Sequence, residues 1–377
     1  AKGEAKGEEE LLVVSASADK TLRFWSDDYG TERYRMEEPD KAAELSCMLS
    51  LPHLGLLATG AHDGSIRWWN VDCGSVARRL EHSNGVSCIC YAVVNNPHSG
   101  SQEDFLFSSS DDGSICVWLL FDLGRFAPHV LAVIPAAHGR YESGEAIEVI
   151  CVAFHEASQL LVSGGNDGNL RCWQPSDRRE RHVMSGHGGP VTSLIGGPGS
   201  LLFSASDDGT FILWTLTGGG GSPAGPLCVV QGHSGRVSGM AVVREHYLVT
   251  VSAEEKLLPW EGGPTVKVWD FAMAQQRSPQ GSADPNQTEL PALAASDDTS
   301  RAAFDGASDD ATQDARTDDG APTKGGGSEL VGLVSEHAVE IGKPSCLAAM
   351  QATDLNPQLC LLVGTTSGPV LRLEIEL

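Results

Sequence analysis

The sequence predicts an all-β fold, a β-propeller of seven blades in which the first and seventh blades are incomplete. Three observations predict it: one short phrase repeats along the chain, each copy has the pattern of a β-hairpin, and the copies recur at the spacing of a four-stranded blade. This repeated motif consists of a run of small residues, an acidic turn, a strand of alternating pattern and a closing tryptophan. Its intact copies are Ser15–Trp25, Thr59–Trp69, Ser108–Trp118, Ser163–Trp173 and Ser204–Trp214.

The closing tryptophans give the period, because they lie 41 to 55 residues apart. A sixth copy, Thr250–Trp269, has an interrupted turn, and a seventh, Val363–Leu373, has lost both the turn aspartate and the tryptophan. Since the same unit recurs throughout, we expect one large repeat domain over residues 11–377, preceded by a polar segment over residues 1–10.

Each copy predicts a hairpin whose two faces are both buried. In the fifth copy an Asp-Gly pair at 208–209 is a strong two-residue turn signal, and apolar residues then alternate to both sides of the following strand. A single sheet cannot cover both of its own faces, whereas blades stacked around an axis can. Trp68, next to Trp69, falls at an apolar position of this pattern and is predicted to lie in the core.

The repeats resemble WD40 repeats. That family also carries a Gly-His pair ahead of each hairpin, which Gly186-His187 and Gly232-His233 match, while residues 82 and 138 match in the histidine alone. The resemblance implies a buried hydrogen-bonded chain of histidine, strand serine, turn aspartate and tryptophan. Carried over, the sets are His187, Ser204, Asp208 and Trp214; His82, Ser108, Asp112 and Trp118; and His138, Ser163, Asp167 and Trp173.

A histidine beside a serine and an aspartate also suggests a catalytic triad. We reject that interpretation because the set recurs from repeat to repeat, whereas a nucleophile is needed once. Some propellers do hydrolyse esters around a central metal, but here the recurring aspartates lie in turns that favour Asp-Gly for its geometry. The sequence therefore predicts no enzyme, no catalytic residue, no cofactor and no metal.

The charge balance favours protein partners. The formal net charge is −24, with 26 basic and 50 acidic residues. Nucleic-acid binding requires lysine and arginine to neutralise phosphates, and anionic membranes attract the same residues. We therefore expect neither nucleic acid nor membrane as a partner, and several proteins in a multi-subunit complex instead.

The ten cysteines are scattered, mostly within strand patterns, without the spacing of zinc ligands. Free buried thiols are typical of a reducing compartment. We find no secretory signal and no apolar run long enough to span a membrane. The sequence predicts an intracellular protein, cytoplasmic or cytoskeletal.

Three insertions interrupt the repeats. Residues 275–328 are rich in Ala, Asp, Ser, Pro and Gly, and we expect an acidic disordered insertion between blades six and seven. Shorter insertions at 139–148 and 256–264 each carry an aromatic residue, and such residues dominate protein interfaces. The candidate interface residues are Tyr141, Leu257, Leu258 and Trp260; the alternative for Trp260 is that it folds back to cap the interrupted sixth blade.

At the two ends, the sequence has no obvious inner strand for blade one and no obvious outer strand for blade seven. We expect this chain to be part of a longer polypeptide whose flanking parts are themselves partners; an imperfect closure by residues 8–12 or 374–377 is the alternative.

The predicted function is a non-enzymatic scaffold for protein–protein interaction within a larger assembly. The repeats look most similar in style to large WD-repeat proteins of the cilium, which implies an axonemal complex. The alternative is a substrate receptor of a cullin-type ubiquitin ligase; receptors of that class resemble one another in a WDxR sequence, and no arginine follows the closing tryptophans in that pattern here.

Overall fold

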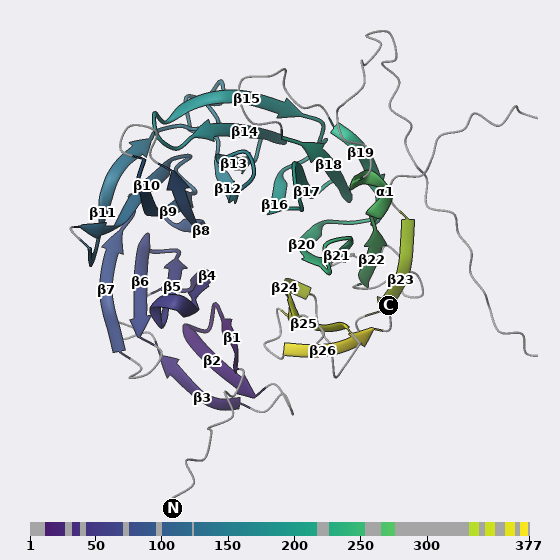
Figure 1. Ribbon diagram of the computed structural model, residues 1–377, viewed down its shortest axis with the longest axis horizontal. Coiled ribbons are helices and arrows are strands. Elements are labelled where there is room, and N and C mark those ends of the chain that lie inside the picture. Colours follow the sequence, from purple (N-terminus) through teal and green to yellow (C-terminus); the bar gives the residue numbers. More distant parts are fainter. Residues whose placement is uncertain are drawn as a thin grey trace, which may run out of the picture.

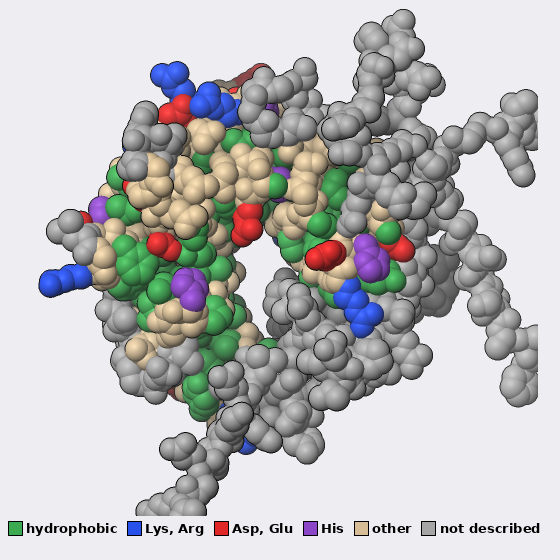
Figure 2. All heavy atoms as spheres, viewed as in Figure 1, with side chains coloured by type: hydrophobic (Ala, Val, Ile, Leu, Met, Phe, Trp, Pro, Cys, Tyr) green, Lys and Arg blue, Asp and Glu red, His purple; other side chains and the backbone are tan. Residues whose placement is uncertain are grey.

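The computed structural model describes residues 12–26, 32–37, 43–70, 75–95, 100–122, 124–216, 226–252, 265–275, 332–338, 344–350, 359–365 and 370–375. Their sheets form a ring around a central opening (Figure 1), which persists when all atoms are drawn (Figure 2). The polar segment 1–10 and most of the predicted insertion 275–328 lie outside the described residues.

Within the described residues, five sheets have four strands each, all antiparallel between neighbours. In chain order they are β4 (Leu45–Leu51), β5 (Leu56–Ala61), β6 (Ser65–Asn70) and β7 (Ser75–Glu81); β8 (Val86–Asn95), β9 (Gln102–Ser110), β10 (Ile115–Asp122) and β11 (Arg125–Ile134); β12 (Val149–His155), β13 (Leu160–Gly165), β14 (Asn169–Gln174) and β15 (Arg179–Ser185); β16 (Val191–Gly196), β17 (Leu201–Ser206), β18 (Thr210–Thr215) and β19 (Pro226–Gln231); and β20 (Val237–Val243), β21 (Tyr247–Ser252), β22 (Thr265–Asp270) and β23 (Gly332–Ala338). A short 3-10 helix η1 (Pro52–Leu54) and a one-turn helix α1 (Ala272–Gln275) complete the elements between them.

Two sheets have three strands among the described residues. They are β1 (Leu12–Ala16), β2 (Thr21–Ser26) and β3 (Glu32–Glu37), and β24 (Pro344–Met350), β25 (Leu359–Thr365) and β26 (Val370–Ile375). Trp25 on β2 occupies the place of Trp69 on β6, so β1 corresponds to β5 and the described part of this sheet has no counterpart of β4. By the same alignment the described part of the β24–β26 sheet has no counterpart of the outer strand β7. These are the two strands that the sequence left unassigned.

The first strand of each four-stranded sheet lies innermost. In Figure 1 these strands surround the opening, and each contacts the first strand of the next sheet. Hydroxyl groups on them donate to backbone carbonyls of the neighbouring sheet: Ser46 to Val86, Ser87 to Val149 at 2.5 Å, and Thr192 to Val237 at 2.5 Å. These hydrogen bonds join consecutive sheets along the inside of the ring.

The core lies between the sheets, as the alternation of apolar residues predicts. Every residue of β5 and of β17 is buried, so both faces of these strands are covered. One cluster joins the β4–β7 and β8–β11 sheets through Trp68, Leu106 and Trp118. The blades are therefore stabilised by each other rather than singly.

The Asp-Gly turns need glycine for two reasons, which Gly64 illustrates. Its φ is +82°, a left-handed conformation in which side chains are strained. A Cβ atom there would also lie 2.7 Å from the carbonyl oxygen of His82, too close for a real contact. The acidic turn of the repeat is thus fixed by backbone geometry.

Candidate protein-interaction surfaces

The set from the fourth intact repeat forms one continuous hydrogen-bonded chain. Trp173 on β14 donates its indole N–H to Ser163 Oγ on β13 at 2.9 Å, and Ser163 is hydrogen-bonded to Nε2 of His138 at 2.8 Å. His138 Nδ1 lies 3.0 Å from Oδ1 of Asp167 in the turn. Because the carboxylate only accepts, Nδ1 carries the proton and Nε2 accepts from the serine. The chain ties the loop before β12 to the β13–β14 hairpin.

The set from the fifth copy is also brought together, with an additional threonine. Trp214 donates to Ser204 Oγ at 2.7 Å, and His187 Nε2 lies 2.6 Å from the same oxygen. On its other side, His187 Nδ1 reaches Thr210 Oγ1 at 3.0 Å and lies 3.6 Å from Asp208 Oδ2. Thr210 in turn donates its hydroxyl to Asp208 Oδ1 at 2.6 Å, so the threonine completes the link.

The set containing His82 is only partly assembled. Trp118 donates to Ser108 Oγ at 2.8 Å, but His82 bonds neither to that hydroxyl nor to Asp112. Its Nδ1 accepts the backbone N–H of Ser83 at 3.0 Å, and the Ser83 hydroxyl binds Asp112 instead. The buried Nε2 has no hydrogen-bond partner among the described residues. The competing serine after the histidine explains the difference.

A fourth network lies in the interrupted sixth repeat. His233 Nε2 lies 2.7 Å from Thr250 Oγ1, which also accepts the Trp269 indole N–H at 2.9 Å. His233 Nδ1 reaches Thr265 Oγ1 at 3.1 Å, so the threonine stands where other repeats use the turn aspartate. Thr265 is the first residue of β22, as Thr210 is of β18. This shared position could have predicted the contact between His233 and Thr265 from the sequence.

These networks stabilise the sheets and are not placed for catalysis. Ser163 and Ser204 are fully buried, so no substrate can reach their hydroxyls. Burial alone would raise the pKa of Asp167, but hydrogen bonds from His138 and Asn169 hold that pKa below its ordinary value. A buried polar network of this kind stabilises a fold when every member has a partner.

The thiols of the innermost strands, which are partly or fully buried, have raised pKa values and are therefore unreactive. Cys47, Cys88, Cys90 and Cys151 lie on the innermost strands β4, β8 and β12 and form no disulfide. Burial, with the neighbouring Cys88, raises the pKa of Cys47 to about 12, and thiolates are what react and bind metals. Among the described residues, no group of histidine, cysteine and acidic side chains could hold a metal ion.

Two buried imidazoles predict a loss of stability in mild acid. Burial lowers the pKa of His82 and of His155 below the ordinary 6.5. Below about pH 6.5 the unfolded chain therefore binds protons that the folded chain does not, so stability falls as the pH drops toward the folded pKa values. His155→Gln should flatten this fall in thermal melts between about pH 7 and 5, because one of the two groups is gone. The exposed His129→Gln is the control, and an unchanged slope in His155→Gln contradicts the prediction.

Of the predicted interface residues, Tyr141 is described and exposed, 41% of its surface being open to solvent. It lies in the loop after His138, which is closed by hydrogen bonds between the backbones of Tyr141, Gly144 and Glu145. Leu257, Leu258 and Trp260 lie outside the described residues. Their role at an interface stays a prediction.

An apolar surface on β11 was missed by the sequence analysis. Three of its side chains, Val130, Leu131 and Val133, are 44–50% exposed. The strand has ten residues, and among the described residues it pairs with β10 alone, so it is the outer edge of its sheet there. Leu131 is the extra residue of a β-bulge opposite Val117 and Trp118. The sequence signal was faint, because an exposed apolar strand and a buried one have the same residue pattern.

The repeats match known sequences over four stretches. The family model described as "WD domain, G-beta repeat" matches residues 35–70, 74–118, 137–174 and 178–215. The chain is 29% identical over 220 residues to telomerase protein component 1 of Rattus norvegicus, covering 57% of this chain and 7% of that protein. It is 27% identical over 199 residues to periodic tryptophan protein 2 of Arabidopsis thaliana, covering 52% and 20% of the two chains.

A third relative is the cilia- and flagella-associated protein 52 of Bos taurus, 23% identical over 204 residues, covering 54% of this chain and 29% of that protein. The chain thus spans less than a third of the length of each of these relatives. Among its described residues, no helix is both long and apolar enough to cross a membrane.

Proposed function

We propose, from the premise that this chain is a WD40-repeat β-propeller, that it is a non-catalytic scaffold that binds other proteins. The names of its relatives refer to telomerase, a periodic tryptophan protein and cilia, so they do not select one assembly. A place in a ciliary complex is one proposal among these, supported by the relative from Bos taurus. We also propose that the two three-stranded sheets are incomplete blades of a seven-bladed ring.

The observation that supports binding best is the apolar surface of β11. Outer strands expose unpaired backbone groups, and soluble proteins usually protect them with charges. Strand β15 of the next sheet follows this rule with Arg179, Glu180 and Arg181. Strand β11 instead exposes Val130, Leu131 and Val133, and an exposed apolar group on an edge strand is typical of a protein interface. The partner we propose is a protein that covers this strand.

Introducing a charge on β11 should release partners without unfolding the ring. We expect Leu131→Lys to lose the proteins that co-purify stoichiometrically from native cells, as judged by mass spectrometry. The substitution is exposed, so its effect on unfolding free energy should stay within about 0.5 kcal/mol. Val183→Lys on β15 is the matched control, since Val183 is 44% exposed on the neighbouring outer strand. Partners that survive Leu131→Lys, or that are lost equally from Val183→Lys, would contradict the proposed surface.

A further inference from the structure

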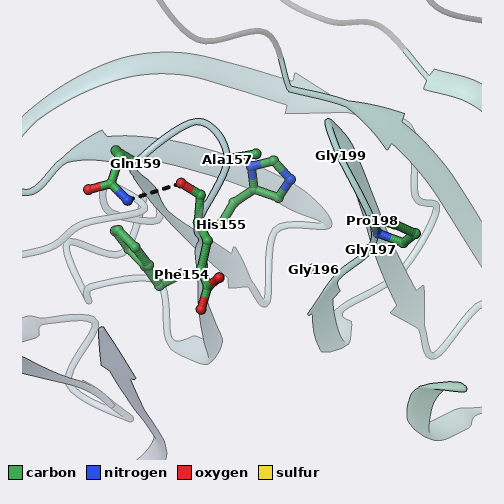
Figure 3. A pocket seen from close by; sticks show the side chains of 9 residues that line it. Phe154, His155, Ala157, Gln159, Gly196, Gly197, Pro198 and Gly199 are labelled. Atoms are coloured by element: carbon green, nitrogen blue, oxygen red, sulfur yellow. Dashed lines mark hydrogen bonds between the residues drawn. The ribbon is translucent and has the colours of Figure 1, made fainter. Parts of the chain in front are cut away.

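A pocket of about 680 Å³ opens between two adjacent sheets. One side is the turn that joins β12 to β13, residues 154–159, and the other is the turn that joins β16 to β17, residues 196–199. Figure 3 shows the His155 ring between the two turns, with Pro198 across the gap. No motif of the repeat falls in these two turns.

The wall on the β12–β13 side is held rigidly. His155 is 2% exposed; its Nε2 lies 3.1 Å from the carbonyl oxygen of Leu201 in the next sheet, to which it donates, and its Nδ1 accepts from the backbone N–H and the hydroxyl of Ser158. Gln159 donates to the Glu156 carbonyl at 3.0 Å, drawn dashed in Figure 3, and accepts the backbone N–H of Asn95 at 3.2 Å. A turn fixed across three sheets is preorganised to bind.

The turn also contains a residue in an uncommon conformation. Gln159 has φ +55°, in the left-handed region that non-glycine residues seldom adopt. Such backbone persists when surrounding contacts hold it, and it is enriched at binding sites. Here the side-chain hydrogen bonds of Gln159 supply those contacts.

The lining combines one carboxylate with apolar surface. Glu156 contributes an exposed carboxylate, whereas both nitrogens of His155 are already engaged. Ala157 and Pro198 contribute apolar surface, and no lysine or arginine lines the pocket. In Figure 2, acidic side chains also border the central opening, consistent with the net charge of −24. Long-range attraction and the local carboxylate therefore favour the same sign of ligand.

The opposite wall is open because of a glycine. A Cβ atom at Gly196 would lie 3.7 Å from His155 Cδ2 and 3.9 Å from the Phe154 carbonyl oxygen, both ordinary contacts. A side chain could therefore be added at 196 without a backbone clash, and it would project into the pocket. At Gly197, in contrast, a Cβ atom would lie 2.6 Å from Phe203 Cε2, so that glycine is required by packing.

We propose that this pocket receives one lysine or arginine side chain from a partner protein, its charge beside Glu156 and its methylene stem along Ala157 and Pro198. The proposal rests on the proposed function, because it names the chemistry of a residue that the scaffold binds. It assigns the pocket to a contact different from β11, which lies on the outside of another sheet.

A positional-scanning library of hexapeptides tests this with the purified chain. We expect lysine or arginine to be enriched at one position, and the enrichment to fall about tenfold in Glu156→Gln, as for the loss of one charge-assisted contact. Gly196→Val should weaken it too, because the added side chain narrows the pocket beside His155. Glu44→Gln, an exposed acid on the loop before β4, is the matched control and should keep it.

Two results would overturn the proposal: no basic preference in the wild-type chain, or a preference that Glu156→Gln and Gly196→Val leave unchanged. Either failure can be separated from failure of the scaffold function. If Leu131→Lys still releases partners while the library shows no pocket-dependent preference, the scaffold stands and the assignment of this pocket falls.

Discussion

Ser204→Ala should lower the free energy of unfolding by about 2–4 kcal/mol, because one hydroxyl serves two buried partners. Ser204 Oγ accepts the Trp214 indole N–H at 2.7 Å and lies 2.6 Å from His187 Nε2. Alanine leaves both groups buried without a partner, and each such group costs about 1–3 kcal/mol. Urea unfolding followed by far-UV circular dichroism measures the loss as a shift in midpoint.

Ser108→Ala should lower the free energy of unfolding less than Ser204→Ala does. The Ser108 hydroxyl also accepts a tryptophan N–H, from Trp118, but this hydroxyl makes no hydrogen bond to His82. We therefore expect about half the loss seen for Ser204→Ala. Equal losses in the two variants would mean that the histidine link contributes nothing, and the network would then be a tryptophan–serine pair alone.

Trp68→Ala should cost about 3–5 kcal/mol, the usual range for removing a large aromatic side chain from a core. Trp68 is fully buried and packs edge-on against Phe126, with ring centroids 5.1 Å apart. Its cluster includes residues of both the β4–β7 and the β8–β11 sheets, so the cavity would weaken two sheets together. Thermal and urea unfolding of the purified variant measure the effect.

Trp68→Phe separates packing from hydrogen bonding. The Trp68 Nε1 is buried without a hydrogen-bond partner among the described residues, unlike the indoles of Trp69 and Trp118. Phenylalanine removes that unsatisfied N–H while keeping most of the aromatic volume, so the cost should stay below about 1.5 kcal/mol. A loss as large as that of Trp69→Phe, in which a made hydrogen bond is broken, would contradict this account.

The propeller fold and its repeat positions were predictable because they depend on a period. The hairpins, the Asp-Gly turns and the alternation of apolar residues recur, so each copy supports the interpretation of the next. The core position of Trp68 was predicted from that alternation alone, and Trp68 is buried in the structure. The described parts of the first and last sheets have three strands each, in agreement with a sequence in which an inner strand for blade one and an outer strand for blade seven are not obvious.

The features that could not be predicted from the sequence depend on single contacts. His82 lies 30 residues before its turn aspartate, one more than the 29 residues between His138 and Asp167, and Ser83 takes the aspartate that the histidine would bind. Thr265 replaces a turn aspartate only because β22 pairs with β21 across the interrupted turn. The pocket beside His155 needs two turns that are some forty residues apart in sequence, and neither turn carries a motif. Such features arise from packing between sheets, which a repeat pattern does not encode.

The hydroxyl-to-carbonyl hydrogen bonds on the inner strands couple the stability of each sheet to that of its immediate neighbours. Ser87 connects the β8–β11 sheet to the β12–β15 sheet, and Thr192 connects the β16–β19 sheet to the β20–β23 sheet. A change in one sheet therefore acts first on the sheets beside it. Disturbance of one blade should then decay within a blade or two instead of melting the whole ring at once. We therefore expect a protein bound to one sheet to stiffen the adjacent sheets before the distant ones.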